Sequence, residues 1–132
     1  MSDFTHLHVH TQYSLLDGTA KIGELLDSAA SLGFDSLAIT DHGVMYGAVE
    51  FCCEAKKRGM KPIIGCEVYT APHSRFGRVH GTDSEYGHLV LLCKNNRGYK
   101  NLMTLVSYAF TEGYYYKPRV DAELLSKYSD GL

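Results

Sequence analysis

Apolar residues along this chain occur in two kinds of pattern, short continuous runs and stripes with helical spacing. The short runs predict strands at residues 4–9, 36–40, 61–68 and 89–93. The stripes, in which apolar residues recur every three or four positions, predict helices that include residues 22–29, 49–56 and 102–109. Strands and helices then alternate in the order β-α-β-α-β-loop-β-α. This order favours an α/β fold with parallel strands and crossover helices, either a doubly wound sheet or part of a (β/α) barrel.

Two details of the pattern concern single elements. In the second helix the stripe consists of Val49, Cys52, Cys53 and Lys56. The run at residues 89–93 has no polar interruption, which is typical of a strand that is buried on both faces.

Two segments show no periodicity. Residues 71–87 are rich in Gly, Ser, His and Arg and predict a long surface loop or flap. Residues 112–119 contain the tyrosines 114–116; such clusters more often pack a loop onto its own domain than stack on bases, so packing is the favoured interpretation. The sequence ends at residues 129–132, where another strand would begin, and we expect the chain to be a fragment.

Composition sets the class of protein. The chain has 132 residues, 45% of them hydrophobic, which suits one domain with a real core. A net charge of −2 gives no global positive field for nucleic acid, although a local patch or a neighbouring domain could still bind it. The four cysteines show no CxxC spacing and read as small buried hydrophobes, which argues against a structural zinc knuckle. Without a membrane span or a signal segment, we expect a cytoplasmic protein with no membrane partner.

Three histidines on alternate positions near the start of the chain are candidate metal ligands. His6, His8 and His10 would share one face of an extended strand, and imidazole is the commonest protein ligand for transition metals. His8 and His10 close the first predicted strand. His6 lies deeper, nearer the amino end of that strand, so a structural role is favoured for it.

The next two predicted strands also end in metal-ligand side chains. Asp41 and His42 close the second strand, Glu67 closes the third, and Asp17 lies in the loop after the first. Because ligands bind at the carboxyl ends of parallel strands, these side chains should gather at one rim. The set exceeds what one ion needs and predicts several zinc, manganese or iron ions and phosphoester hydrolysis. Taken singly, the Asp41-His42 pair could cap a helix and Glu67 could pair with a lysine.

The remaining candidates have weaker support. His88 begins the fourth predicted strand instead of ending it, so strand geometry alone makes it structural. His73, His80, Arg75 and Arg78 fall in the predicted flap, where solvated loop residues are favoured over phosphate contacts.

Several motifs resemble those of the PHP (polymerase and histidinol phosphatase) superfamily. They are His8-Val9-His10-Thr11 with Ser14 and Asp17-Gly18, then Ile39-Thr40-Asp41-His42-Gly43, then Lys61-Pro62-Ile63-Ile64-Gly65-Cys66-Glu67. Further blocks at residues 13–18, 47–51, 88–92, 98–102 and 112–119 look like the amino-terminal PHP domains of bacterial DNA polymerase III alpha subunits. The resemblance covers essentially the whole chain.

This resemblance implies a distorted, TIM-like (β/α)7 barrel whose rim holds up to three divalent ions, zinc, manganese or iron. The implied metal ligands are His8, His10, Asp17, His42, Glu67 and His88, with Asp41 beside them as an orienting residue of the catalytic site. Here the family favours His88 as a ligand. Family members continue to a Ser-Gly-Cys type strand and a terminal Asp-x-His pair, so residues 1–132 should form the amino-terminal portion of an incomplete PHP barrel that is inactive in isolation.

The resemblance also implies a parent protein. We expect a DNA-directed DNA polymerase, with DNA and other holoenzyme subunits as partners, whose PHP domain acts as a metal-dependent 3′-5′ proofreading exonuclease; Arg75 or Arg78 would steady the DNA backbone. The alternatives are a non-catalytic platform that stabilises the polymerase and docks a proofreading subunit, or a free-standing phosphatase of the histidinol-phosphatase type. An unfinished barrel edge further predicts a homodimer of the fragment.

Overall fold

The computed structural model describes residues 4–15 and 17–132. The start of the chain at residues 1–3, where no signal segment is predicted, and Leu16 of the motif block 13–18 lie outside the described residues. The elements follow in the order α1 (Ile22–Ser31), β1 (Ser36–Ile39), α2 (Ala48–Lys57), β2 (Lys61–Thr70), β3 (Gly87–Leu92), α3 (Asn96–Thr111), β4 (Arg119–Val120) and α4 (Ala122–Tyr128).

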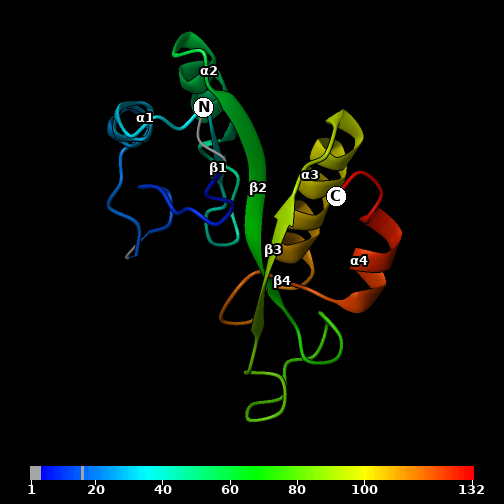
Figure 1. Ribbon diagram of the computed structural model, residues 1–132. Coiled ribbons are helices and arrows are strands. Elements are labelled where there is room, and N and C mark those ends of the chain that lie inside the picture. The colour runs from blue at the N-terminus through cyan, green and yellow to red at the C-terminus, as the bar shows by residue number, and fades with distance from the viewer. Residues whose placement is uncertain (1–3, 16) are drawn as a thin grey trace.

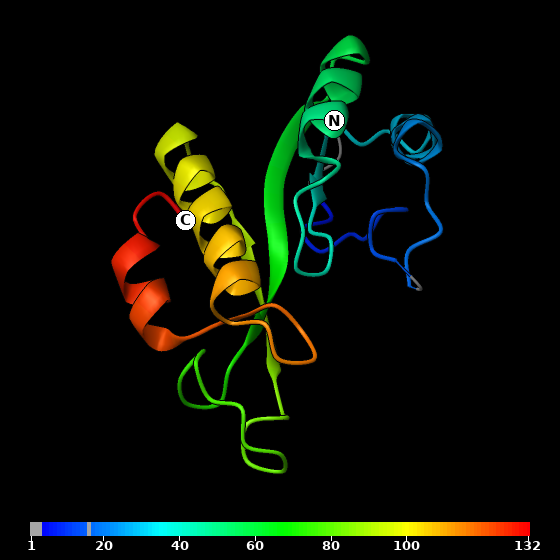
Figure 2. The same ribbon diagram turned by 180° about the vertical axis from the view of Figure 1, so that it is seen from behind.

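The long strand β2 forms the centre of a mixed sheet. Its first half pairs in parallel with β1, from Ser36 opposite Lys61 to Ile39 opposite Ile64. Its second half pairs antiparallel with β3 and, at its end, in parallel with β4. In Figures 1 and 2, α1, α2 and β1 lie on one side of β2, and β3, α3 and α4 lie on the other. The α/β prediction is therefore confirmed.

The direction of β3 corrects the prediction of parallel strands throughout. A parallel pair needs a crossover of a dozen or more residues, usually a helix, whereas the segment between β2 and β3 is an irregular loop that returns the chain beside β2. The strand is also not buried on both faces, because Leu89 is 39% exposed. Among the described strands β3 pairs with β2 alone, which leaves its outer edge open.

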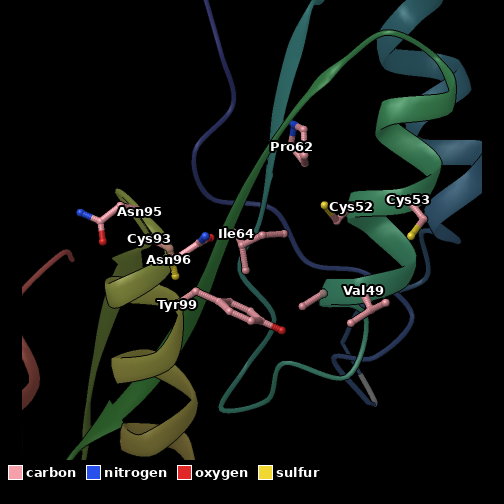
Figure 3. A pocket seen from close by; sticks show the side chains of 10 residues that line it. Val49, Cys52, Cys53, Pro62, Ile64, Cys93, Asn95, Asn96 and Tyr99 are labelled. Atoms are coloured by element: carbon pink, nitrogen blue, oxygen red, sulfur yellow. The ribbon is translucent and has the colours of Figure 1, made fainter.

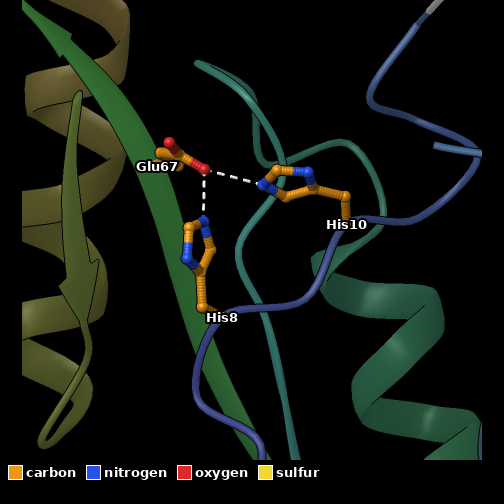
Figure 4. Close-up of side chains that lie close together, drawn as sticks. All are labelled: His8, His10 and Glu67. Carbon is orange, nitrogen blue, oxygen red and sulfur yellow. Dashed lines mark hydrogen bonds and ion pairs between the residues drawn. The ribbon is translucent and has the colours of Figure 1, made fainter. Parts of the chain in front are cut away.

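The first predicted strand is present as an extended segment without a regular ladder. Its backbone follows β1 through two hydrogen bonds, from Ala38 N to His6 O (3.1 Å) and from Thr40 N to Val9 O (2.8 Å). The Thr40 side chain replaces a further ladder bond, because its Oγ1 accepts from Val9 N at 2.7 Å. The segment nevertheless runs beside the sheet, with His8 and His10 reaching towards β2 (Figure 4).

The helix α2 forms where predicted but buries a different face. The buried residues are Ala48, Phe51 and Ala55, which recur at helical spacing, and Phe51 and Ala55 pack in one core with β1 and α1. Of the predicted stripe, Val49, Cys52 and Cys53 line an open, largely apolar cavity of about 360 Å³ between α2 and α3 (Figure 3). Cys66 is buried, Cys52 and Cys93 are partly buried, and Cys53 is exposed. The expectation of buried cysteines is therefore confirmed for Cys66 and wrong for Cys53.

The carboxyl-terminal elements complete a second core. The helix α3 begins with an Asn95 cap, whose side chain accepts from Arg97 N and Gly98 N, and it buries Leu102, Leu105 and Ala109 as its stripe predicts. The helix α4 is not predicted by the sequence pattern. Both helices pack with the second half of β2. The first core joins α1, β1 and α2. It contacts β2 at Ile64, whereas the second core includes Cys66 and Val68 further along the same strand.

Candidate metal centre

One carboxylate oxygen of Glu67 lies at the middle of the candidate site. Glu67 is on β2 and is almost fully buried. Its Oε2 lies 2.5 Å from His8 Nε2 and 2.7 Å from His10 Nε2 (Figure 4). His42 Nδ1 lies 3.6 Å from the same oxygen. Three imidazoles therefore converge on one carboxylate oxygen.

A second carboxylate bridges two of these histidines. Asp17 Oδ2 lies 3.1 Å from His10 Nδ1 and 2.8 Å from His42 Nε2. The loop that carries Asp17 turns back tightly, with Gly18 N donating to Ser14 O at 2.7 Å. A Cβ at Gly18 would lie 1.9 Å from the Thr11 carbonyl oxygen, so the turn requires glycine after Asp17.

The segment after β1 is fixed beside Glu67 by backbone hydrogen bonds. Glu67 N donates to Asp41 O (3.0 Å), and Gly43 N donates to Glu67 O (2.8 Å). These bonds place His42 directly across from Glu67. Gly43 has φ of 65°, and a Cβ there would lie 3.0 Å from the Tyr69 ring, which packs nearly parallel to the His42 ring.

The antiparallel direction of β3 brings His88 to the same rim. In a parallel sheet the start of a strand lies at the far end from the ligand rim, but His88 is directly opposite Tyr69 near the carboxyl end of β2. Glu67 and Tyr69 are two residues apart and share a face of β2, so His88 faces the cluster. Its ring centroid lies 5.6 Å from that of His42. Strand geometry made His88 structural only because β3 was predicted to be parallel.

The ligand-type atoms form three overlapping groups. These are His8, His10 and Glu67; His10, Asp17 and His42; and His42, Glu67 and His88, with the atoms of each group within 4.8 Å of one another. All six implied ligands belong to at least one group, and His10, His42 and Glu67 are shared. Shared ligands are what a site for neighbouring ions requires.

The donor set fits divalent metal ions. Imidazole nitrogen and carboxylate oxygen lie about 2.0–2.2 Å from zinc and suit manganese and iron as well. The buried atom His42 Nδ1 has no hydrogen-bond partner among the described residues. A buried nitrogen without a partner costs free energy unless a ligand satisfies it. A metal ion held by the neighbouring ligand groups would satisfy this nitrogen.

The histidines also determine the charge of Glu67. Burial on its own raises the pKa of a carboxyl group. The hydrogen bonds from His8 and His10 and the nearby His42 outweigh burial and lower the pKa of Glu67 below its usual value. Glu67 is therefore ionised at neutral pH and is ready to act as a ligand.

Asp41 lies behind the cluster, with both of its oxygens in use. Its Oδ1 accepts from Thr11 N (2.6 Å) and Ser14 Oγ (2.7 Å), and its Oδ2 accepts from Thr11 Oγ1 (2.8 Å). Ser14 Oγ in turn accepts from His42 N at 3.1 Å. Asp41 thus fixes the backbone on either side of the histidines, which agrees with an orienting role.

Other candidates lie outside the cluster. His6 is exposed, and its ring packs against Phe4 and Phe34 at centroid distances of 4.8 and 5.3 Å. Arg75 is 7% exposed and is bound to Glu112, Asp121 and Glu123, so it is not free to contact DNA, contrary to expectation. Arg78 is exposed and donates to Glu112 O. The loop histidines His73 and His80 are exposed and belong to none of the groups described above.

Sequence reasoning missed two features of the site. Tyr69 is nearly buried and contacts the rings of His42 and His88. The alternation of β2 was a usable signal, since Tyr69 follows Glu67 by two positions. Thr11 and Ser14 were noted only as motif residues, although both are buried and bind Asp41.

The family model of the PHP domain matches residues 6–132. The chain belongs to the PHP domain family. It is similar to DNA polymerase III subunit alpha of Treponema pallidum (54% identity over 130 residues, 98% of this chain and 11% of that protein) and of Aquifex aeolicus (48% over 136 residues, 98% and 12%). The PHP chain thus spans about a tenth of the length of these curated relatives.

Solved structures support the same PHP fold. The chain is similar to an amidohydrolase from Chromobacterium violaceum with bound sulfate and no metal (TM-score 0.56, 26% identity, 80% of this chain and 32% of that one). It shares the fold of a candidate metal-dependent phosphoesterase from Bifidobacterium adolescentis (TM-score 0.56, 18% identity, 82% and 34%). The predicted PHP fold is confirmed. Among the described residues, no helix is long and apolar enough to cross a membrane.

Proposed function

We propose that this PHP domain binds two or three divalent metal ions and hydrolyses the terminal phosphodiester bond at the 3′ end of DNA. The observation that carries the proposal is the convergence of His8, His10 and His42 on one oxygen of Glu67. A single structural ion would not need so many shared ligands. The similarity to DNA polymerase III alpha subunits supports DNA as the substrate.

The ions would supply the Lewis acid that polarises a phosphoryl oxygen and lowers the pKa of water. The chain's own residues hold the geometry. Asp17 keeps the His10 and His42 rings in fixed orientations through its Oδ2. Ser14, bound to Asp41, fixes the backbone of His42. These contacts arrange the ligands before substrate arrives, which reduces the cost of ordering them during the reaction.

The biological setting is part of the same proposal. Residues 1–132 would form the amino-terminal portion of the PHP domain of a cytoplasmic DNA polymerase III alpha subunit, with the other holoenzyme subunits as partners. Zinc and manganese are the proposed ions, with iron as a third choice. The open edge of β3 would pair with a second copy if the fragment is produced alone, and its elution as a strict monomer would contradict that pairing.

The test is a hydrolysis assay with the full-length protein that carries this chain. Single-stranded DNA labelled at its 5′ end is incubated with manganese or zinc, and loss of the 3′ nucleotide is measured. We expect His10→Ala to lower the rate by more than about 100-fold, because His10 belongs to two ligand groups. His73→Ala, which changes an exposed loop histidine, is the matched control.

The outcomes separate the alternatives. Absence of metal-dependent hydrolysis in the unmodified protein, or equal rates for the unmodified and His10→Ala proteins, would contradict the exonuclease. Metal binding without hydrolysis would favour the platform that docks a proofreading subunit. Hydrolysis of a small phosphomonoester but not of DNA would favour a phosphatase.

A further inference from the structure

A second cavity opens beside the metal centre. Its volume is about 270 Å³, close to the lower end of the range for small-molecule sites, about 300–1,000 Å³. His42 is part of its wall, so the cavity and the metal centre share a side chain. Most of the remaining wall is aromatic and includes Tyr13 and Tyr46, whose rings are in contact, and Tyr114 and Tyr116.

The loop between α3 and β4 presents two of these tyrosines to solvent. Tyr115 is half-buried, and the guanidinium of Arg119 lies 5.2 Å from its ring centroid. Its neighbours Tyr114 and Tyr116 are 54% and 60% exposed. The favoured sequence interpretation, in which the tyrosines pack onto the domain, fits Tyr115 best. Tyr114 and Tyr116 also contact the rings of Phe110 and Tyr115, but more than half of each residue stays exposed.

The backbone is strained to achieve this arrangement. Tyr116 has φ of 59°, and no other non-glycine residue in the described part of the chain has a positive φ. Tyr115 N donates to Lys117 O at 3.1 Å, which closes a tight turn around Tyr116. A left-handed conformation is costly for a residue with a large side chain and persists where the surroundings impose it. Here the residue in that conformation carries an exposed aromatic ring that lines the cavity.

Charge around the cavity favours an anionic ligand. Lys117 belongs to the wall, with its Nζ 5.3 Å from the Tyr69 ring centroid. Tyr69 stacks on His42 and so connects Lys117 to the metal centre. Among the described residues that form the wall there is no carboxylate. A ligand that extends from the metal centre into this cavity would meet the cation of Lys117 and aromatic faces, and the described wall residues add no carboxylate to those of the metal centre.

We propose that this cavity binds the base of the nucleotide whose phosphate lies at the metal centre, with Tyr114 and Tyr116 as the stacking surface. The proposal rests on the proposed function, because it takes the phosphate to lie at the ions. Every nucleobase has a π face, so stacking on tyrosine tolerates any sequence. The cavity volume of about 270 Å³ leaves room for a single base. Tyr114 and Tyr116 are thus positioning residues for the substrate.

A binding assay tests this subsite without requiring hydrolysis. The probe is 2-aminopurine deoxyribonucleoside 5′-monophosphate, whose fluorescence is quenched by stacking, added to the full-length protein with manganese. Stacking is worth about 1–3 kcal/mol per base, so we expect Tyr116→Leu and Tyr114→Leu each to weaken binding at least about five-fold. The corresponding Phe variants, which keep the ring, should lose less than the Leu variants.

The matched control is Phe76→Leu, which removes another exposed aromatic ring outside the cavity and should leave binding unchanged. Deoxyribose 5-phosphate, which has no base, should compete at least about five-fold more weakly than deoxyadenosine monophosphate. Equal competition by the two compounds, unchanged binding in both Leu variants, or no quenching by the unmodified protein would overturn the subsite. Quenching in a protein that lacks exonuclease activity would instead retain the subsite and reject the proposed reaction.

Discussion

The molecule contains two buried polar clusters that are built on opposite principles. Around Arg119, which is fully buried, every guanidinium nitrogen has a partner: the group donates to the carbonyl oxygens of Gly113, Asp83, Arg75 and Gly77. Around Glu67, histidines crowd one oxygen and His42 Nδ1 has no hydrogen-bond partner among the described residues. The nitrogens of the first cluster are satisfied by the protein itself, whereas the second leaves a buried nitrogen for the ligand that we propose.

This difference separates structural charge from functional charge. Arg119 holds the carbonyls of the loop 71–86, and neighbouring Arg75 ties the same loop to Glu112 and Asp121. Arg119 is fully buried and Arg75 is 7% exposed, so neither side chain is presented to DNA. Arg75 and Arg119 thus stabilise the fold, whereas we propose a chemical role for the side chains at the strand ends.

The largest expected effect comes from breaking the Arg119 cluster. Arg119→Met should destabilise the loop 71–86 by roughly 3–5 kcal/mol, because each buried carbonyl that loses its donor costs about 1–3 kcal/mol. Amide hydrogen exchange in the full-length protein measures the local opening free energy.

The control for this prediction is Arg78→Met. Arg78 is exposed in the same loop and donates to a single carbonyl, so its loss should change the opening free energy by less than about 0.5 kcal/mol. Equal exchange in the two variants would show that burial and saturation of Arg119 do not distinguish it.

A smaller effect is expected from Asp121, the carboxylate partner of Arg75. Burial raises the pKa of Asp121. Hydrogen bonds from Arg75 N and Leu124 N and the charge of Arg75 outweigh burial, so the pKa lies below its usual value. A lowered folded-state pKa stabilises the fold fully above the unfolded value of about 3.9, and this stabilisation is lost as pH falls through the folded-state pKa.

Asp121→Asn should therefore cost about 1–3 kcal/mol at neutral pH and progressively less as the pH falls towards about 2. The unfolding free energy of both proteins, measured across that range, checks the prediction. Asp130→Asn, at an exposed aspartate, is the comparison. A cost that stays constant with pH would mean that the ionised carboxylate is not what stabilises this cluster.

The smallest effect tests the support of the Glu67 cluster. Ser14→Ala removes the hydroxyl that joins Asp41 to the backbone of His42 and should lower metal affinity by about 10-fold. Isothermal titration with manganese measures the affinity. Ser107→Ala, which removes an exposed hydroxyl on α3, should leave it unchanged. An unaltered affinity in Ser14→Ala would show that His42 needs no such support.

The two clusters also differ in how far sequence predicts them. His8, His10, Asp17, His42 and Glu67 could be placed together because strand ends meet at one rim. The Arg119 cluster could not, because its acceptors are backbone carbonyls, which leave no mark in the side-chain pattern.

The fold shows a similar division. The apolar stripes of α1 and α3 predict their buried faces. In α2 two sets of residues have helical spacing, and the structure buries Ala48, Phe51 and Ala55 instead of the set that begins with Val49. The direction of β3 depends on the absence of a crossover helix, and the periodicity of a strand does not encode its direction. That single error removed His88 from the predicted rim.

The metal content of the full-length protein tests the central claim, that the Glu67 cluster is completed by divalent ions, most directly. The unmodified protein and the Glu67→Gln variant are dialysed to equilibrium against manganese, and the ions bound per chain are counted by elemental analysis. Glu24→Gln, at an exposed glutamate on α1, is the control. The account predicts that Glu67→Gln loses ions that the unmodified and Glu24→Gln proteins retain. Equal metal content in all three proteins would contradict it.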